Sequence, residues 1–377
     1  MQKLGDYIRE VDVRNKDLKV TNLVGLTIEK AFIPSVANII GTDLSNYKII
    51  RKEQFACSLM QVSRDGKMPI AMFEKDKAIM SPAYPMFEVM DKSKLLPQYL
   101  MMWFYRSEFD REASYYAVGG VRGSLTWEDF LNMQLPIPSI EQQREIVSEY
   151  ETISKRIKLN EQIIKNLEAT AQTLYHKMFV EGIDKENLHE GWRIGTLGEF
   201  GAIVTGKTPS TLDENNFGTY MPFITIPDMH DTCYAIKTER MLSQKGVQTQ
   251  SNKTIPKNSI CVSCIGTSGL VVITTQDCQT NQQINSIVLT DIQYVYYVYM
   301  LCSNLEKIIS EYGIGGAVLN NLNKTEFEKL TALIPPKTTI YKYYDKVSPI
   351  FKNIYTSKQE NDKLIELQSL LLAKMGR

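Results

Sequence analysis

The chain of 377 residues is 43% hydrophobic and 23% charged, and its 43 basic side chains are balanced by 43 acidic ones. This length exceeds that of a usual single domain, so two or more hydrophobic cores are expected. The zero net charge excludes a strongly basic nucleic-acid-binding protein, and any affinity for DNA must come from local patches or from a partner. The sequence has no apolar run near the roughly 18 residues of a membrane span and no signal-peptide core, so a cytoplasmic protein is expected.

The first part of the chain, residues 1–138, is predicted to form one domain. Short β-type runs such as residues 70–73 are separated by Gly, Pro and Asn, which is typical of strands joined by turns. A helix is expected among them, around residues 97–109. This mixture indicates an α+β domain.

Residues 139–181 are predicted to form a long helix. The run Ser139-Ile140-Glu141-Gln142 has the form of a capping box, in which the Ser and Gln side chains bind free backbone amides. Seam residues then follow at alternating spacings of four and three, which is the heptad pattern of a coiled coil. This predicted seam consists of Ile146, Tyr150, Ile153, Ile157, Asn160, Ile164, Leu167, Ala171, Leu174 and Met178.

The second half of the chain repeats this plan at an offset of about 197 residues. Residues 182–335 carry β-type runs at 259–263, 270–274 and 286–289 and a predicted helix at 292–310. The offset relates Gly119-Gly120 to Gly315-Gly316, Leu125 to Leu322, Phe130 to Phe327 and Pro138 to Pro335. A second seam in residues 336–377 consists of Tyr343, Val347, Ile350, Ile354, Ser357, Asn361, Leu364, Gln368, Leu371 and Met375.

Two helices with matching seams favour a coiled coil with each other, although each could instead lie only on its own domain. The short connection at residues 181–191 favours antiparallel pairing, with the two domains related by a pseudo-two-fold axis. Polar Asn160, Asn361 and Gln368 at seam positions would fix the register. Because of Pro349, the second helix should either begin near that residue or bend there.

No catalytic motif emerges from the sequence. Gly206-Lys207-Thr208 resembles the end of a phosphate-binding loop, but the first glycine of such a loop is misplaced and Pro209 would interrupt the following helix. The three histidines form no metal-binding pair, and Cys261-Val-Ser-Cys264 is only one arm of a zinc site. The six cysteines are therefore expected to be reduced and buried. The chain is expected to bind rather than to catalyse, with no cofactor or metal of its own.

Several stretches resemble type I restriction-modification specificity subunits. These are residues 135–146, Leu-Pro-Ile-Pro-Ser-Ile-Glu-Gln-Gln-Arg-Glu-Ile, the helix end at 174–179, and the opening of the second half at 191–199 followed by Thr-Gly-Lys-Thr-Pro at 205–209. The order of domain, helix, domain and helix is similar to that family over the whole chain. The first half lacks the Gly-Trp opening, and residues 335–339 lack the Glu-Gln of the first helix start.

The resemblance implies an α+β fold of two target-recognition domains, at residues 1–138 and 182–335, with two long helices at 139–181 and 336–377 forming an antiparallel coiled coil. Each domain would read one half of a bipartite target in double-stranded DNA, and the coiled coil would set the spacer. Two methylation subunits would bind along the helices and supply adenine methylation with S-adenosylmethionine. Restriction/translocase subunits would add translocation and cleavage that depend on ATP and Mg.

Base recognition uses Arg or Lys for guanine, Asn or Gln for adenine, and small hydroxyl side chains. Polar residues on predicted loops are therefore candidates for DNA contact, although any one of them is more often an ordinary exposed side chain. In the first domain the candidates are Arg64, Lys67, Tyr84 and Arg122, and in the second they are Lys207, Thr208, Ser210, Thr267, Ser268, Asn281, Gln282 and Gln283.

Two other functions stay open at this point. A non-catalytic coiled-coil scaffold with two ligand-binding lobes would have the same elements, and so would an enzyme whose site no motif reveals. Methylation of a split DNA sequence only together with a methylation subunit would indicate recognition. Activity of the chain alone would indicate an enzyme.

Overall fold

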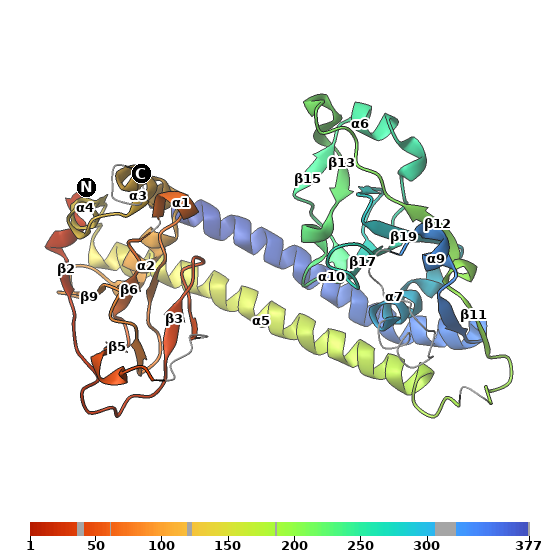
Figure 1. The fold of residues 1–377 in the computed structure, drawn as a ribbon, viewed down its shortest axis with the longest axis horizontal. Helices are drawn as coiled ribbons and strands as arrows, with labels where there is room; N and C mark the ends of the chain where they lie inside the picture. The colour runs from red at the N-terminus through yellow and green to blue at the C-terminus, as the bar shows by residue number, and fades with distance from the viewer. Residues whose placement is uncertain (36–40, 61, 119–122, 185–186, 306–321, 376–377) are drawn as a thin grey trace. The chain divides into compact units, whose positions relative to one another are not determined.

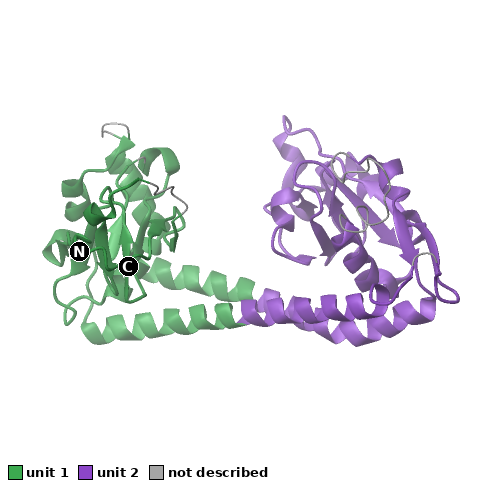
Figure 2. Ribbon diagram, turned by 60° about the horizontal axis from the view of Figure 1, so that its bottom comes forward, with its two compact units in different colours: residues 1–159, 361–377 green, residues 160–360 purple. Residues whose placement is uncertain are grey.

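The computed structural model of this chain describes residues 1–35, 41–60, 62–118, 123–184, 187–305 and 322–375. The chain forms two compact units, one made of residues 1–159 with 361–377 and the other of residues 160–360 (Figure 2). We call them unit 1 and unit 2. Each unit contains part of both long helices, α5 (Ile140–Phe179) and α10 (Lys337–Lys374), so compactness divides the chain differently from the four segments expected along the sequence.

Unit 1 is built on an antiparallel sheet with the strand order β2-β9-β6-β7. Two further antiparallel strand pairs, β3-β4 and β5-β8, lie beside this sheet (Figure 1). Its strands are β1 (Gln2–Lys3), β2 (Ile8–Glu10), β3 (Val24–Leu26), β4 (Phe32–Pro34), β5 (Lys48–Arg51), β6 (Phe55–Cys57), β7 (Ile70–Met72), β8 (Lys77–Met80), β9 (Met86–Val89) and β10 (Gln134–Leu135). Its short helices are α1 (Val62–Asp65), α2 (Pro97–Tyr105), α3 (Ser107–Ala117) and α4 (Trp127–Asn132).

Aromatic side chains form the centre of the unit 1 core. Phe55 and Phe87 stack across neighbouring strands with ring centroids 5.0 Å apart, and Phe104 of α2 meets Phe55 edge-on at 5.9 Å. The helix expected at 97–109 is two helices, because Arg106 has extended backbone angles and its guanidinium lies 4.1 Å from the ring centre of Trp103. This break lets α2 pack on β7 while α3 turns to pack against α1.

Unit 2 is built on a sheet with the strand order β12-β19-β16-β17-β14 and a smaller one with the order β15-β13-β18. Its strands are β11 (Arg193–Thr196), β12 (Gly201–Thr205), β13 (Phe217–Ile224), β14 (Tyr234–Ala235), β15 (Arg240–Leu242), β16 (Ile260–Ser263), β17 (Val271–Thr274), β18 (Gln279–Thr280), β19 (Ile284–Leu289) and β20 (Thr331–Ile334). Its short helices are α6 (Gln244–Gln248), α7 (Val295–Ser303) and α9 (Lys324–Glu328).

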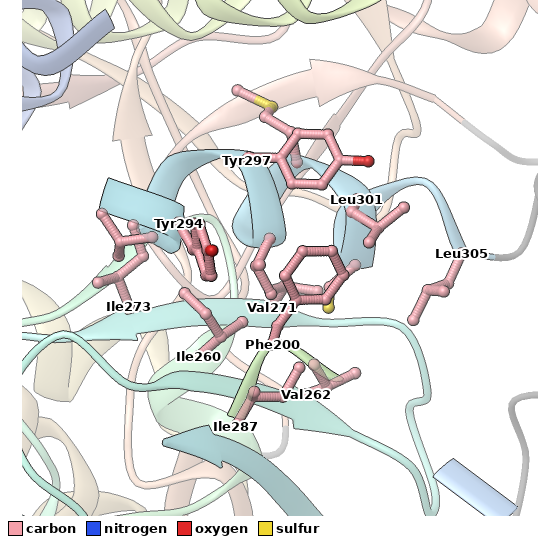
Figure 3. Close-up of a cluster of buried hydrophobic side chains, with 14 of the residues drawn as sticks. Phe200, Ile260, Val262, Val271, Ile273, Ile287, Tyr294, Tyr297, Leu301 and Leu305 are labelled. Atoms are coloured by element: carbon pink, nitrogen blue, oxygen red, sulfur yellow. The ribbon is translucent and has the colours of Figure 1, made fainter. Parts of the chain in front are cut away.

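Helix α7 joins the sheet of unit 2 to the long helices. Figure 3 shows Leu301 of this helix in one cluster with Ile260 and Ile287 of the sheet. On its other side, the ring of Tyr297 lies 4.6 Å from that of Phe179 on α5. The helix expected at 292–310 thus ends at Ser303, and the part of that prediction beyond residue 305 lies outside the described residues.

The strands predicted at 70–73, 259–263, 270–274 and 286–289 are confirmed as β7, β16, β17 and β19. The strand order also extends the internal repeat, because β2-β9-β6-β7 of unit 1 matches β12-β19-β16-β17 of unit 2. The start of each half is equivalent too: β1 pairs with β10, and β11 pairs with β20. The repeated glycine pairs at 119–120 and 315–316 lie outside the described residues.

The two long helices pair in antiparallel fashion within each unit. In unit 1, the Gln368 side chain donates to Ser154 Oγ at 2.7 Å, while in unit 2 Asn160 donates to Glu360 at 3.0 Å. Further along unit 2, the Tyr343 hydroxyl donates to the Ala171 carbonyl at 3.1 Å. As the number on α5 rises, the partner's number on α10 falls, which confirms the antiparallel prediction.

The helix starts follow from local sequence. Ser139 accepts a bond from the Gln142 amide at 3.3 Å, and Gln142 accepts one from the Ser139 amide at 3.1 Å, so the predicted capping box is confirmed. The second helix does not begin near Pro349, because α10 starts at Lys337 and continues through this proline. Proline at that position removes one bond of the helix.

The predicted seam holds in part. Asn160, Ile164, Ala171, Tyr343, Val347, Ile354, Asn361 and Met375 are buried, whereas Ile146, Ile153, Ile157, Leu167, Leu174, Ile350, Leu364 and Leu371 are half-buried. Tyr175, Phe179 and Phe351 are also buried although they lie off the predicted seam. The reason is that α5 and α10 pack on the globular part of each unit as well as on each other. The coiled-coil interpretation is therefore confirmed, and neither helix lies only on its own domain.

Candidate nucleic-acid interface

In unit 2, the predicted DNA-contacting residues lie on three neighbouring loops at one end of the sheet. Lys207 and Thr208 follow β12, and the backbone amide of Lys207 donates to the Thr280 carbonyl at 2.9 Å. Gly206 makes this approach feasible, because a Cβ there would lie 2.1 Å from the backbone oxygen of Asn281. Two chain segments about 75 residues apart in sequence are thereby held in backbone contact.

Side-chain bonds connect these loops further. Thr208 Oγ1 donates to Gln282 Oε1 at 2.6 Å, and the Asn281 side-chain amide donates to Gln283 Oε1 at 3.0 Å. The third loop, between β16 and β17, joins them because the Gln283 side chain donates to the Ile265 carbonyl at 3.4 Å. Six predicted residues of this group are at least partly exposed, namely Lys207, Thr208, Thr267, Ser268, Gln282 and Gln283.

Two further predicted residues of unit 2 sit differently. Asn281 is only 8% exposed and its amide is used within the loop, so its present contacts position the loop. Ser210 is exposed, and its carbonyl accepts a bond from the buried Asn216 side chain at 3.0 Å. Neither position is tested as a DNA contact, and both stay predictions.

In unit 1, the predicted residues lie on the connections that correspond to two of these loops. Arg64 and Lys67 are exposed in the β6–β7 connection, which is equivalent to the β16–β17 loop of unit 2. The Ser63 hydroxyl donates to the Gly123 carbonyl at 3.4 Å, which places this connection beside the segment that follows Arg122. Arg122 itself lies outside the described residues.

The charge of Arg64 is partly balanced, because its Nε lies 2.6 Å from the carboxylate of the adjacent Asp65. This bond lowers the pKa of the Asp65 carboxyl. The Arg64 side chain is 65% exposed, and a pair this open to solvent adds little to stability. The guanidinium therefore stays available to another anion or acceptor.

Tyr84 lies in the turn before β9, which corresponds to the position of Gln282 before β19. In both units this turn is bound to the end of the central strand: the Cys57 amide donates to the Pro85 carbonyl at 3.0 Å, and the Cys264 amide donates to the Gln283 carbonyl at 2.8 Å. The Tyr84 carbonyl accepts a bond from Lys48 Nζ at 3.1 Å. The half-buried Tyr84 side chain packs on a small core cluster of unit 1.

Sequence reasoning missed a cluster of charged residues in unit 1, Asp12, Arg14 and Lys48, of which Lys48 contacts the Tyr84 turn. The Arg14 guanidinium bonds to both carboxylate oxygens of Asp12, and Lys48 Nζ lies 3.8 Å from the same carboxylate. The bond from Arg14, together with the charge of Lys48, holds the pKa of Asp12 below its usual range. The repeat visible in the sequence begins near residue 119 and does not reach the first strands, so it did not point to this segment.

The six cysteines are free and buried, as expected. Cys261 accepts a weak bond from the Ser286 hydroxyl and Cys264 one from the Asn285 side chain, both at 3.4 Å. Burial raises the pKa of the Cys261 thiol to about 12 and raises that of Cys264. Within the described ranges, no group of three His, Cys, Asp or Glu side chains is placed to hold a metal ion, and no helix is long and apolar enough to cross a membrane.

Comparison with known proteins gives the family. The sequence model for the type I restriction modification DNA specificity domain matches residues 36–169 and 189–366, one stretch in each half of the chain. The chain belongs to this family. The two matched stretches of this specificity-domain chain agree with the internal repeat that the strand order shows.

Two curated relatives of the specificity-domain chain are specificity subunits. The type I restriction enzyme HindI specificity subunit of Haemophilus influenzae is 40% identical over 187 residues, which are 49% of this chain and 41% of that protein. The MjaIX specificity subunit of Methanocaldococcus jannaschii is 25% identical over 199 residues, 51% of this chain and 45% of that protein. The matches thus span less than half the length of these relatives.

The fold of the specificity-domain chain has a counterpart among solved structures. One counterpart is the crystal structure of a type I restriction-modification system S subunit from M. genitalium. The match covers 100% of this chain and 95% of that one, with a TM-score of 0.60. Its sequence identity is 14%, so this likeness concerns the fold alone. The α+β fold with long helices, expected from the sequence, is confirmed.

Proposed function

We propose that this chain is the DNA sequence-recognition subunit of a type I restriction-modification complex, in which each unit reads one half of a bipartite target. The observation that carries the proposal is the duplication: the family's specificity domain matches both halves, and both halves present polar loops at the same end of equivalent sheets. A duplicated reader suits a target with two separate halves. Side chains on such loops can reach base edges in the major groove.

The long helices would connect the two readers and set the number of unread base pairs between them. Helices α5 and α10 each have residues in both units, which supports this role for them. Two methylation subunits would bind along these helices. Restriction/translocase subunits would join the complex to translocate and cut DNA.

The chain itself would be non-catalytic and act in the cytoplasm. S-adenosylmethionine, ATP and Mg would bind the partner subunits, and this chain would hold none of them. Its neutral composition fits a protein whose partners supply part of the attraction to phosphates, which dominates the affinity of proteins for DNA.

The test is a methylation map. The chain and its cognate methylation subunit are expressed together, and each alone, in a bacterial host free of DNA methylation, and long-read sequencing locates N6-methyladenine. We expect a bipartite motif with both proteins and none when either is omitted. A purified, stable complex that yields no motif would contradict recognition and favour a scaffold with two ligand-binding lobes.

A further inference from the structure

The segment that follows the first strand of each sheet has the same place in both units. The Val11 amide donates to the Met86 carbonyl at 2.8 Å, and the Gly206 amide donates to the Ile284 carbonyl at 3.0 Å. In each case the acceptor is the first residue of the neighbouring strand, β9 or β19. Residues 12–14 of unit 1 are therefore the counterpart of residues 207–209 of unit 2, where two predicted DNA-contacting residues lie.

The Arg14 side chain is fixed in place by its neighbours. Its Nε and one terminal nitrogen bond to the two carboxylate oxygens of Asp12, and the other terminal nitrogen donates to the Asn46 carbonyl at 2.8 Å. Its backbone is fixed as well, because Arg14 forms an isolated β-bridge with Lys48 at the start of β5. The guanidinium keeps N–H donors beyond these bonds, and its side chain is 34% exposed.

The local charge favours an acceptor-rich ligand. Two cations, Arg14 and Lys48, surround the single carboxylate of Asp12. The Lys48 side chain is only 6% exposed and donates to the Tyr84 carbonyl at 3.1 Å, so it ties the segment to the turn before β9. An exposed ion pair adds little to stability, so stability alone gives little reason to fix one side chain by so many bonds.

A guanidinium held by a carboxylate suits the recognition of guanine. Guanine presents two acceptors, O6 and N7, on its major-groove edge, and arginine reads them with two parallel N–H bonds. Holding the side chain in advance reduces the rotamer entropy lost on binding. Unit 2 has Lys207, Thr208 and Pro209 in the equivalent segment, and such a difference is expected of two units that read different half-sites.

We propose that Arg14 reads a guanine in the half-site recognised by unit 1, and that Asp12 is the positioning residue that orients it. This inference rests on the proposed function. It names the ligand of the segment, a guanine edge in the major groove of duplex DNA. Lys48 keeps the segment in register with the Tyr84 turn.

The test compares methylation motifs of variants in the full chain, expressed with the methylation subunit. In Arg14→Gln, one guanine of one half-site should lose about ten- to a hundredfold of its discrimination, while every other position of the motif is kept. Asp12→Asn should relax the same guanine to a smaller extent. Arg9→Gln is the matched control, because Arg9 is also paired with a carboxylate, that of Glu88, but lies within β2 and should leave the motif intact.

If Arg14→Gln methylates too weakly to give a motif, binding of the purified complexes decides. Replacing the relevant guanine by 7-deazaguanine removes the N7 acceptor, so it should weaken the wild-type complex about tenfold and should not weaken the variant further. Equal losses in both complexes would overturn the inference. A loss of affinity in the wild-type complex alone would show that Arg14 contacts the major-groove edge of that guanine. A variant that was merely misfolded would not give this difference.

Two outcomes of the motif comparison separate this inference from the proposed function. A bipartite wild-type motif that Arg14→Gln leaves unchanged, or whose methylation falls evenly at all positions, would overturn the guanine contact and leave the function intact. Such an even fall would indicate a phosphate contact. The lack of any bipartite motif in the wild type would overturn both.

Discussion

Gly206 is the residue that lets the first two loops of the unit 2 interface meet. Its amide bonds to Ile284, and the Asn281 carbonyl oxygen occupies the space that any larger residue would need. In unit 1 the equivalent contact is made by Val11 and Met86. The side chains that would read DNA differ between the units, whereas this backbone contact is common to both.

Replacing Gly206 by Ala should destabilise unit 2 by about 2 kcal/mol, since a Cβ 2.1 Å from a backbone oxygen forces the loops apart. Chemical unfolding of the purified chain measures this change. Gly25→Ala is the control, because the nearest heavy atom to its new Cβ lies 4.0 Å away in open packing. Equal, small effects of the two substitutions would contradict the close loop contact.

A buried ion pair holds the β3–β4 turn of unit 1. Lys30 Nζ lies 2.9 Å from the Asp110 carboxylate and also donates to the Phe104 carbonyl, and the two side chains are 4% and 12% exposed. Burial lowers the pKa of Lys30, and the bonds to Asp110 oppose this shift. Asp110 also accepts a bond from the Met68 amide at 3.1 Å, so it holds two segments at once.

Lys30→Met should cost about 3–5 kcal/mol of stability, because it leaves the Asp110 charge buried without its partner. Adding Asp110→Asn removes that charge but keeps an acceptor for the Met68 amide. The free energy of unfolding of the double variant should therefore exceed that of Lys30→Met by at least about 1 kcal/mol. Thermal unfolding of the single and double variants gives both values. A double variant less stable than Lys30→Met would contradict this account of the pair.

Residue types and loop positions allowed the polar loops that meet in unit 2 to be predicted, and contact of these loops with DNA stays a prediction. Lys207, Thr208, Gln282 and Gln283 do come together, because short polar stretches next to β-type runs mark loop ends in the sequence. Arg14 was missed because its setting depends on Asn46 and Lys48, which are distant in sequence. No local pattern records a contact of that kind.

At the scale of elements, the long helices show how far a heptad pattern extends. It correctly places α5 and α10, since helical periodicity depends on residues three or four apart. The antiparallel direction was predicted instead from the short connection at residues 181–191. It omits Phe351, whose ring stacks 4.2 Å from that of Tyr296 on α7. Phe351 is buried by its contact with the globular part of unit 2. A repeat pattern within one helix does not predict contacts of this kind.

Pro349 is an exposed proline in the interior of α10. Pro349→Ala restores an N–H donor to the helix, so it should stabilise unit 2 by about 1–3 kcal/mol. Lys352→Ala, at an exposed position of the same helix, should change stability by less than about 0.5 kcal/mol. The free energy of unfolding in urea measures both. A loss of stability in Pro349→Ala would mean that packing requires the path that proline gives to the helix.

At the scale of the whole chain, two equivalent sheets and two long helices suggest a modular reader. The strand order β2-β9-β6-β7 recurs as β12-β19-β16-β17, although most strand residues differ between the units. The sequence revealed the repeat at the helices and at Pro138 and Pro335, where spacing is strict. The strands diverged too far to show it, since packing conserves their order rather than their residues.

Inserting one heptad into α5 and a matching one into α10 should lengthen the spacer of the target and keep both half-sites. Seven residues lengthen a helix by about 10.5 Å, which corresponds to about three base pairs of B-DNA. The methylation motif of the lengthened chain measures the change. An insertion in α5 alone is the control and should disturb the bonds from Asn160 to Glu360 and from Gln368 to Ser154. An unchanged spacer in the doubly lengthened chain would mean that the helices do not set it.

The central claim is that each unit reads its own half of a bipartite DNA target. Exchanging residues 191–335 for the corresponding domain of a related specificity subunit, followed by mapping of N6-methyladenine, tests it most directly. We predict that one half-site changes to that of the donor while the other half-site stays the same. Retention of both original half-sites, or a change in both, would contradict the claim.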